Sequence, residues 1–400
     1  MTTSHGPLFV KPARSLLVFW AALALLNLAA AIVVAEDPQR ASDLGSITRW
    51  GHAWLVDGLN VYQPADSATD YPPNAIVLLS PLSLLPWSVA VPVWAAINLM
   101  LVLLAPYFAA RFYNPFAPFR IIVLPILLFL CWGGNRTLLQ FTLLALTLAM
   151  AALFLADRRP LTSGVCLGLA FMKPQVAVPV LLWTLFMRRW RIASTAAGVG
   201  AVAFAIFCIR THAGPIEVVT RWIQILGLYH TDGTDLFGLS ELRPLLMAMA
   251  PNGSSVDRAH GAIAAGLFAG ICVAGLQEGR TRTRLLYAAP PLAACWALLA
   301  VYHLTYGFVV LLPVLMLLTL SNTERSRLRI AMFWLLQLGL MFDIPGLARR
   351  AGLRGTPVFD RVLIHADRVL VMALFAGLVT LAWKEPPLPD NLRGPDQVVG

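Results

Sequence analysis

Residues 88–110 read SVAVPVWAAINLMLVLLAPYFAA and contain no charged residue. A helix of about 20 apolar residues crosses a hydrocarbon core of about 30 Å, so this stretch is long enough to span a membrane. Comparable apolar runs recur from residue 16 to residue 383. Of the 400 residues, 58% are hydrophobic and only 12% are charged, whereas a soluble domain carries about 25% charged residues. The composition excludes a water-facing globule and predicts an all-α polytopic membrane protein.

About twelve transmembrane helices are expected, because twelve apolar segments of the chain contain no charged residue. These segments lie near residues 16–35, 88–110, 121–132, 138–156, 161–172, 176–187, 192–209, 261–276, 285–301, 304–320, 330–342 and 369–383. The first run exceeds the roughly 7–15 residues of a signal-peptide core, so we expect it to be retained. The shorter runs predict tilted helices, or half-helices packed inside the bundle.

The arginines support this order of spans. With a cytoplasmic N-terminus, each predicted cytoplasmic loop holds a basic cluster, as the positive-inside rule requires. The clusters contain Arg111 and Arg120, then Arg158 and Arg159, then Arg188, Arg189 and Arg191, then Arg280, Arg282 and Arg284, then Arg325, Arg327 and Arg329. The net charge of +10 therefore reflects arginines that set the orientation of the spans in the membrane. Because the chain shows no continuous basic face, we expect membrane lipids as partners and no nucleic acid.

The predicted organisation is a single membrane domain, residues 1–383, located in the cell membrane. Long extracytoplasmic loops are expected near residues 36–74, 210–260 and 343–368, with very short turns at Gly133–Thr137, Lys173–Gln175 and Tyr302–His303. The polar, proline-rich residues 384–400 are expected to form a disordered cytoplasmic tail.

The first loop contains a predicted helix. Ser42 is a suitable N-cap, and Leu44, Ile47, Trp50 and Trp54 follow at helical spacing. A helix with two tryptophans on its apolar side is expected to lie in the membrane interface plane. The bundle should thus carry a partly helical extracytoplasmic layer.

Four motifs follow one another along the chain. They are Ser42-Asp43-Leu44, then Tyr71-Pro72-Pro73-Asn74, then Met172-Lys173-Pro174-Gln175, then Tyr302-His303-Leu304-Thr305-Tyr306 with Leu311-Leu312-Pro313. Together they resemble the GT-C membrane glycosyltransferases, and most closely glycosyltransferase family 87. That family includes mycobacterial mannosyltransferases that use polyprenyl-phospho-mannose. The resemblance extends from Leu16 to about Leu320 and implies a GT-C-like bundle of about 12 transmembrane helices.

Two motifs depart from the family pattern. Members often carry a histidine pair in the late turn, where this chain has His303 alone. Their Gly-Gln-x-Asn turn corresponds here to Gly133-Gly134-Asn135-Arg136. The glutamine is missing, so no role of that residue can be carried over.

The resemblance implies an inverting glycosyltransferase. It would move a hexose, with mannose the first choice, from a polyprenyl-phosphate sugar to a lipid or glycan acceptor outside the cytoplasm. The alternative class is a polytopic transporter or lipid-linked-sugar flippase. A transporter should place charges near mid-membrane and show repeat symmetry. This sequence shows neither feature clearly.

Asp43 is the candidate catalytic base, because it follows the first span where the family places its catalytic aspartate. A carboxylate within hydrogen-bond reach can take the proton of an attacking hydroxyl. The alternative is that Asp43 only charges a helix N-terminus. Asp37 and Asp57 are weaker candidates.

The leaving lipid phosphate calls for cationic groups at the membrane surface. Lys173, His303 and Arg136 are the donor-phosphate candidates. The alternatives are a snorkelling lysine, a core histidine and an arginine that marks a helix end.

Tyr62, Tyr71 and Asn135 are the candidates for contact with acceptor or sugar. For the tyrosines, the alternative is that they anchor the membrane interface. No cofactor and no metal site are expected, because the sequence has no Asp-x-Asp pair, no histidine cluster and no cysteine pair at ligand spacing.

Overall fold

The computed structural model describes residues 13–35, 42–63, 69–137, 140–231, 241–249, 253–276, 280–300, 305–320, 326–356, 358–359 and 362–384. All regular elements in these ranges are helices. In chain order they are α1 (Arg14–Ala35), α2 (Ser42–Leu55), α3 (Pro73–Leu79), η1 (Ser80–Leu84), α4 (Trp87–Tyr113), α5 (Phe119–Thr137), α6 (Thr142–Leu155), α7 (Pro160–Ala170), α8 (Pro174–Phe186), α9 (Trp190–Thr211), α10 (Pro215–Thr231), α11 (Arg243–Met249), α12 (Gly253–Leu276), α13 (Arg280–Ala300), η2 (Thr305–Leu311), α14 (Leu312–Leu320), α15 (Arg327–Phe342), α16 (Ile344–Arg350), η3 (Leu363–His365) and α18 (Ala366–Lys384).

Each of the twelve predicted apolar segments coincides with a helical segment. Within the described part of the chain, five helical stretches are long and apolar enough to cross a membrane. They are Trp87–Tyr113, Trp190–Thr211, Ser254–Val273, Arg327–Arg350 and Leu363–Ala382. Further apolar stretches, measured over the residues whose side chains the structure describes, have 10–17 residues each. The all-helical membrane class is thus supported, while a count of twelve crossings stays a prediction.

Proline explains why α7 and α8 are separate. Lys173 has an extended backbone (φ −128°, ψ 90°) and precedes Pro174, which begins α8. A residue before proline avoids the helical conformation, and proline fits the first position of a helix. The predicted turn at Lys173 is therefore confirmed. The turn predicted at Gly133–Thr137 is wrong, because these residues continue α5; glycine is well tolerated in membrane helices.

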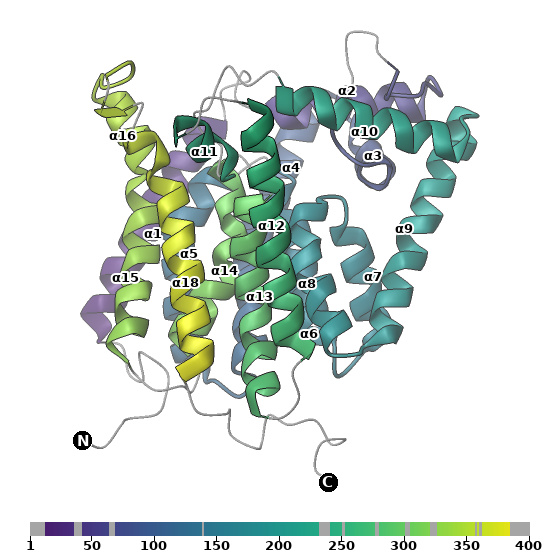
Figure 1. The fold of residues 1–400 in the computed structure, drawn as a ribbon. Coiled ribbons are helices and arrows are strands. Elements are labelled where there is room, and N and C mark those ends of the chain that lie inside the picture. The colour runs from purple at the N-terminus through teal and green to yellow at the C-terminus, as the bar shows by residue number, and fades with distance from the viewer. Residues whose placement is uncertain are drawn as a thin grey trace.

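A layer of helices covers one end of the bundle. Figure 1 shows α2, α10, α11 and α16 at this end, with α10 running across it. These helices come from the predicted long loops, so the expected helical layer is present. The loop predicted at 210–260 is shorter than expected, because α12 already begins at Gly253.

The apolar stripe of α2 corrects one expectation. Leu44, Ile47, Trp50 and Trp54 are all buried against protein, where we expected contact with the membrane interface. Trp54 stacks on Phe207 of α9 with ring centroids 5.9 Å apart. The pattern of α2 was read correctly as amphipathic, but its apolar face packs on the bundle.

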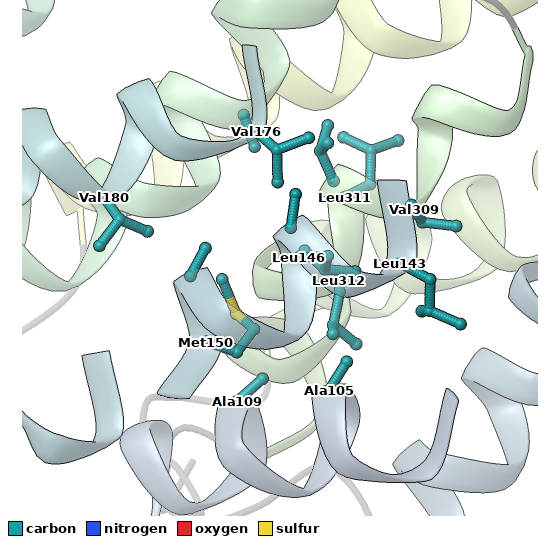
Figure 2. Packing of buried hydrophobic residues seen from close by; sticks show 14 of the residues in the cluster. Ala105, Ala109, Leu143, Leu146, Met150, Val176, Val180, Val309, Leu311 and Leu312 are labelled. Carbon is teal, nitrogen blue, oxygen red and sulfur yellow. The ribbon is translucent and has the colours of Figure 1, made fainter. Parts of the chain in front are cut away.

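The core lies between α4, α6, α8 and the η2–α14 segment. Figure 2 shows Ala105 and Ala109 of α4 beside Leu146 and Met150 of α6. Small residues on α4 let α6 approach closely, which favours van der Waals packing where lipid replaces water as solvent. Leu143 and Val176, near the N-terminal ends of α6 and α8, belong to the same buried cluster (Figure 2).

Glycines bring α7 against α9. A Cβ atom on Gly164 would lie 2.5 Å from Cβ of Thr195, and one on Gly168 would lie 2.6 Å from Cβ of Val199. Only glycine permits this approach, as in other membrane helix pairs with small residues four positions apart.

Candidate functional site

The centre of the candidate site is the short segment Thr69–Tyr71, which leads into α3. Tyr71 N–H donates to Thr69 Oγ1 at 3.0 Å, and Tyr62 Oη donates to Tyr71 O at 2.7 Å. Trp222 of α10 donates from Nε1 to Asp70 O at 2.9 Å. Pro72 is extended and Pro73 opens α3, which fixes the exit of the chain. The segment is therefore held from several sides.

Aromatic rings pack around Tyr71. Its ring centroid lies 6.0 Å from that of Trp50 in α2 and 6.3 Å from that of Phe141, at the start of α6. Such separations are typical of favourable aromatic pairs. Tyr71 therefore joins the helical layer to the bundle.

Lys173 lies over the ring of Tyr71. Its Nζ is 5.1 Å from the ring centroid, a cation–π distance. The residue is only 5% exposed although it sits in a turn between helices. Burial lowers the pKa of Lys173, while the carboxylates of Asp43 and Asp70 act to raise it. Lys173 thus lies within the electric field of two acids.

Asp43 lies in the first turn of α2 and is half-buried. The packing of Leu44 and Ile47, both buried, fixes this end of the helix. Asp43 also interacts with Asp70. Burial raises the pKa of Asp70 above its ordinary value; the Lys173 ammonium opposes this rise, and the Asp43 carboxylate adds to it. The fold therefore brings together Asp43, Asp70 and Lys173, which are far apart in the sequence.

Tyr62 supports this centre from behind. It is 1% exposed, its hydroxyl bonds the Tyr71 carbonyl, and its ring lies 5.4 Å from Phe207. Burial and the Asp70 carboxylate raise its pKa well above the ordinary value. The side chain is enclosed by protein in this structure, and the predicted contact of Tyr62 with a sugar stays a prediction.

Buried polar atoms without hydrogen-bond partners among the described residues lie on Trp94 and on the two chain neighbours of Phe141. Its ring centroid is 4.7 Å from that of Trp94 in α4. Trp94 Nε1, Gln140 Oε1 and Thr142 Oγ1 are buried and have no hydrogen-bond partner among the described residues. Buried polar atoms are normally bonded to protein, water or ligand. These three groups are therefore available to form hydrogen bonds with the hydroxyl groups of a ligand.

A cavity of about 90 Å³ lies beside the site. It lies between α3, α7 and α9, and its lining includes Asn74, Leu78, Gly168, Leu169 and Val199. Asn74 follows directly on Tyr71-Pro72-Pro73, and Leu169 lies one helical turn before Lys173. The cavity is thus mostly apolar and adjoins the polar centre.

Three predicted site residues cannot be assigned to this centre. His303 lies outside the described residues, and the side chains of Asn135 and Arg136 do as well, although α5 carries their backbone. The segment after His303, η2, packs against α5, α6 and α13. That His303, Asn135 and Arg136 share one site with Asp43 and Lys173 stays a prediction.

Asp70 is the residue that sequence reasoning missed. Its spacing does not separate it from the other acids of residues 36–74, although it directly precedes Tyr71-Pro72-Pro73. That position next to a structured turn was the available signal. In the described part of the chain, no group of three or more His, Cys, Asp or Glu residues could hold a metal ion.

Comparison with known proteins gives one match. The family model described as glycosyltransferase family 87 matches residues 69–341, more than half of the chain. The matched region includes Asp70, Tyr71 and Lys173, whereas Asp43 precedes it. No curated protein and no solved structure matches the chain significantly.

Proposed function

Since this chain belongs to glycosyltransferase family 87, and is a glycosyltransferase with a sugar donor and an acceptor, we propose that its donor is a polyprenyl-phosphate sugar. The transferred sugar is a hexose, and the family resemblance favours mannose. The acceptor is a lipid or glycan outside the cytoplasm. Family membership decides against the transporter or flippase that the sequence had left as an alternative.

The observation that carries the proposal is the buried Lys173 in the field of Asp43 and Asp70. A lipid-linked sugar brings its phosphate to the membrane surface, where an ammonium group can bind it as a compact point charge. Lys173 is the donor-phosphate residue of the proposal. His303 and Arg136 are further phosphate contacts in it.

The carboxylate of Asp43 completes the chemistry. An acceptor hydroxyl attacks the anomeric carbon on the face opposite the phosphate and forms the new glycosidic C–O bond. The bond between that carbon and the phosphate oxygen breaks, and the polyprenyl phosphate leaves with its electron pair. Asp43 takes the hydroxyl proton as general base. One displacement of this kind inverts the anomeric configuration.

The surroundings supply further binding groups. The ring of Tyr71 offers a face to the sugar, and Trp94, Gln140 and Thr142 offer donors and acceptors for its hydroxyl groups. Asn135 belongs to the same proposed sugar side. The apolar cavity between α3, α7 and α9 offers space for the isoprenoid chain near its phosphate.

The test is sugar transfer from radiolabelled polyprenyl-phospho-mannose in membranes that contain the wild-type protein or Asp43→Asn. General-base catalysis contributes about 10²- to 10⁴-fold to a rate, so the variant should lose at least about 100-fold. Asp57→Asn is the matched control, because Asp57 is an exposed acid of the same segment paired with His52. It should keep the wild-type rate.

The outcomes separate the parts of the proposal. Equal rates for wild type and Asp43→Asn would keep the donor and remove Asp43 as base. If the wild type transfers no mannose, other hexose donors on the same lipid test the sugar. Transfer from none of these lipids would overturn the proposed donor class.

A further inference from the structure

Helix α10 begins at the level where the hydrocarbon core of a membrane would end. It follows α9, whose 22 residues are long and apolar enough to cross a membrane. At 1.5 Å per residue such a helix is about 33 Å long, which matches a hydrocarbon core of about 30 Å. Residues 212–214 separate α9 from α10, which runs across the end of the bundle (Figure 1). α10 therefore lies at the level of one membrane surface.

Hydrogen bonds fix the corner between the two helices. His212 has a left-handed backbone (φ 50°, ψ 25°), and its N–H donates to carbonyl groups in the last turn of α9. Ala213 N–H donates to Cys208 O at 3.3 Å. A left-handed residue that caps a helix in this way ends the helix and redirects the chain. The direction of α10 across the bundle is thus set by the corner itself.

One face of α10 packs on the protein. Val218 and Ile225 are buried, and Trp222 between them donates from Nε1 to Asp70 O at 2.9 Å. The three residues follow at the spacing i, i+4, i+7, which places them on one side of a helix. This face attaches α10 to the helical layer and to the Thr69–Tyr71 segment of the candidate site.

A second face of α10 is apolar and exposed. It consists of Ile216, Val219 and Ile223, whose exposed fractions are 84%, 40% and 58%. Their spacing is i, i+3, i+7, so they form a continuous row, and this row lies roughly a third of a turn around the helix from the packed face. Contact of such an apolar row with water is unfavourable, whereas contact with hydrocarbon is not.

The third face of α10 is polar and exposed. It consists of Glu217, Thr220 and Gln224, again at the spacing i, i+3, i+7. Arg221 lies beside this face and pairs with Glu217 at 2.9 Å. The packed, apolar and polar faces thus each occupy roughly a third of the helix circumference. This division fits a helix that lies where protein, hydrocarbon and water meet.

The apolar row continues the exposed surface of α9. On α9, Val202, Ile206 and Ile209 are exposed, and a helix that crosses a membrane presents such residues to lipid. Ile209 lies in the last turn of α9 and Ile216 in the first turn of α10, on either side of the fixed corner. The lipid that covers α9 is therefore the natural partner of the row on α10.

We propose that α10 is an interfacial helix whose row Ile216, Val219 and Ile223 binds bilayer lipids at the boundary between headgroups and acyl chains. The polar face is then turned to headgroups and water. Because Trp222 holds the Asp70 carbonyl, a helix seated on lipid also holds the segment that carries Tyr71. The interface position that the sequence predicted for α2 belongs to α10. The inference is independent of the sugar donor.

Fluorescence quenching tests the three faces. An environment-sensitive fluorescent amino acid replaces one exposed residue of α10 at a time, in the full-length protein in phosphatidylcholine nanodiscs. The lipid quencher is a phosphatidylcholine with a nitroxide on the acyl chain near the headgroup, and the aqueous quencher is iodide. Probes at Val219 and Ile223 should emit at shorter wavelength and be quenched by the nitroxide lipid. Probes at Thr220 and Gln224 should emit at longer wavelength and be quenched by iodide.

Two positions elsewhere in the chain calibrate the quenching. Ile206 is exposed on the membrane-spanning α9 and gives the response to lipid, whereas Asp157 is exposed in the turn between α6 and α7 and gives the response to water. Quenching of the Ile223 probe by iodide as strongly as the Asp157 probe would overturn the inference. Shielding of the Ile223 probe from both quenchers would also overturn it, because protein, such as a second copy of this chain, would then cover the row.

A matched pair of substitutions gives an independent measurement. Ile223→Asp places a charge against lipid, so α10 should detach and its amides should exchange with deuterium faster than in the wild type in nanodiscs. Gln224→Asp places the same charge on the polar face and should leave the exchange of α10 unchanged. The amides of α9 report whether the bundle stays folded in both variants. Equal exchange of α10 in the two variants would contradict contact between the row and lipid.

Discussion

At the residue scale, Lys173 combines two properties that oppose each other. It is almost fully buried, which disfavours its charge, yet it adjoins two acids and an aromatic face, which favour that charge. A lysine that only snorkelled to the interface would keep its ammonium in water. The snorkelling alternative from the sequence therefore does not fit the structure.

Replacement of Lys173 should weaken use of the donor. A hydrogen bond to a charged group contributes about 1.5–3 kcal/mol, so Lys173→Gln should lower kcat/KM for the donor by roughly 10- to 100-fold. The measurement is initial transfer rates at varied donor concentration. Arg221→Gln removes a cation from the same layer, where Arg221 pairs with Glu217. This variant should keep the wild-type kcat/KM for the donor. An unchanged kcat/KM in Lys173→Gln would remove Lys173 from the donor site.

Asp70 shows the limit of residue-level reading. The first loop contains six acids, and sequence spacing alone gave no ground to separate Asp70 from the solvated ones. Its position depends on α10, whose Trp222 holds the Asp70 carbonyl from 152 residues away. Contacts over such sequence distances are made by tertiary packing, which local patterns do not encode.

At the element scale, α2 illustrates an ambiguity of membrane proteins. An apolar stripe with tryptophans fits a lipid interface and an apolar protein surface equally well, because lipid tails are as apolar as leucine. The stripe was predicted correctly, and the partner it packs on was not. The partner is the bundle, through η1, α3 and Phe207 of α9.

The packing of α7 on α9 gives an element-scale prediction. Gly168→Leu would place side-chain atoms where the Ala196 carbonyl and Val199 already lie within 2.9 Å of a Cβ atom. Overpacking of this kind destabilises by about 1–3 kcal/mol, so the variant should unfold at a lower Tm in detergent. Gly198→Leu, on α9 with no atom within 4 Å of its Cβ position, is the control. Equal losses of Tm in both variants would indicate that the α7–α9 contact does not depend on glycine.

At the scale of the whole molecule, the helical layer lies at one end of the bundle, and the α6–α7 and α8–α9 turns lie at the other (Figure 1). These two turns contain Arg158, Arg159, Arg188 and Arg189. The positive-inside rule then predicts that the layer, and the candidate site with it, faces away from the cytoplasm. Sidedness decides which acceptors the enzyme can reach.

Cysteine labelling tests the sidedness. Asp57→Cys lies in the turn just after α2, and Asp157→Cys lies in the turn between α6 and α7; both aspartates are exposed. A membrane-impermeant maleimide should label Asp57→Cys in intact cells and Asp157→Cys only after permeabilisation. The wild type gives the background from its five native cysteines. Labelling of Asp157→Cys alone in intact cells would invert the topology, and equal labelling of both would contradict the predicted separation.

The amino-acid sequence by itself determined the class of the protein, the approximate positions of its apolar helices and its family. These properties follow from local features: long uncharged runs, prolines at helix starts, and short motifs in a fixed order. The Lys173-Pro174 turn belongs with them, since proline restricts the backbone of its immediate neighbours.

Tertiary structure alone decided what these elements contact. It buried the tryptophans of α2 in protein, enclosed Tyr62 behind Tyr71, and brought Asp70 from an unremarkable loop position to Lys173 and Asp43. The physical reason is that packing and electrostatic interaction depend on distance in space, which the chain sets only when distant segments meet. A site built from α2, α10, the Thr69–Tyr71 segment and the turn at Lys173 therefore forms only in the folded bundle.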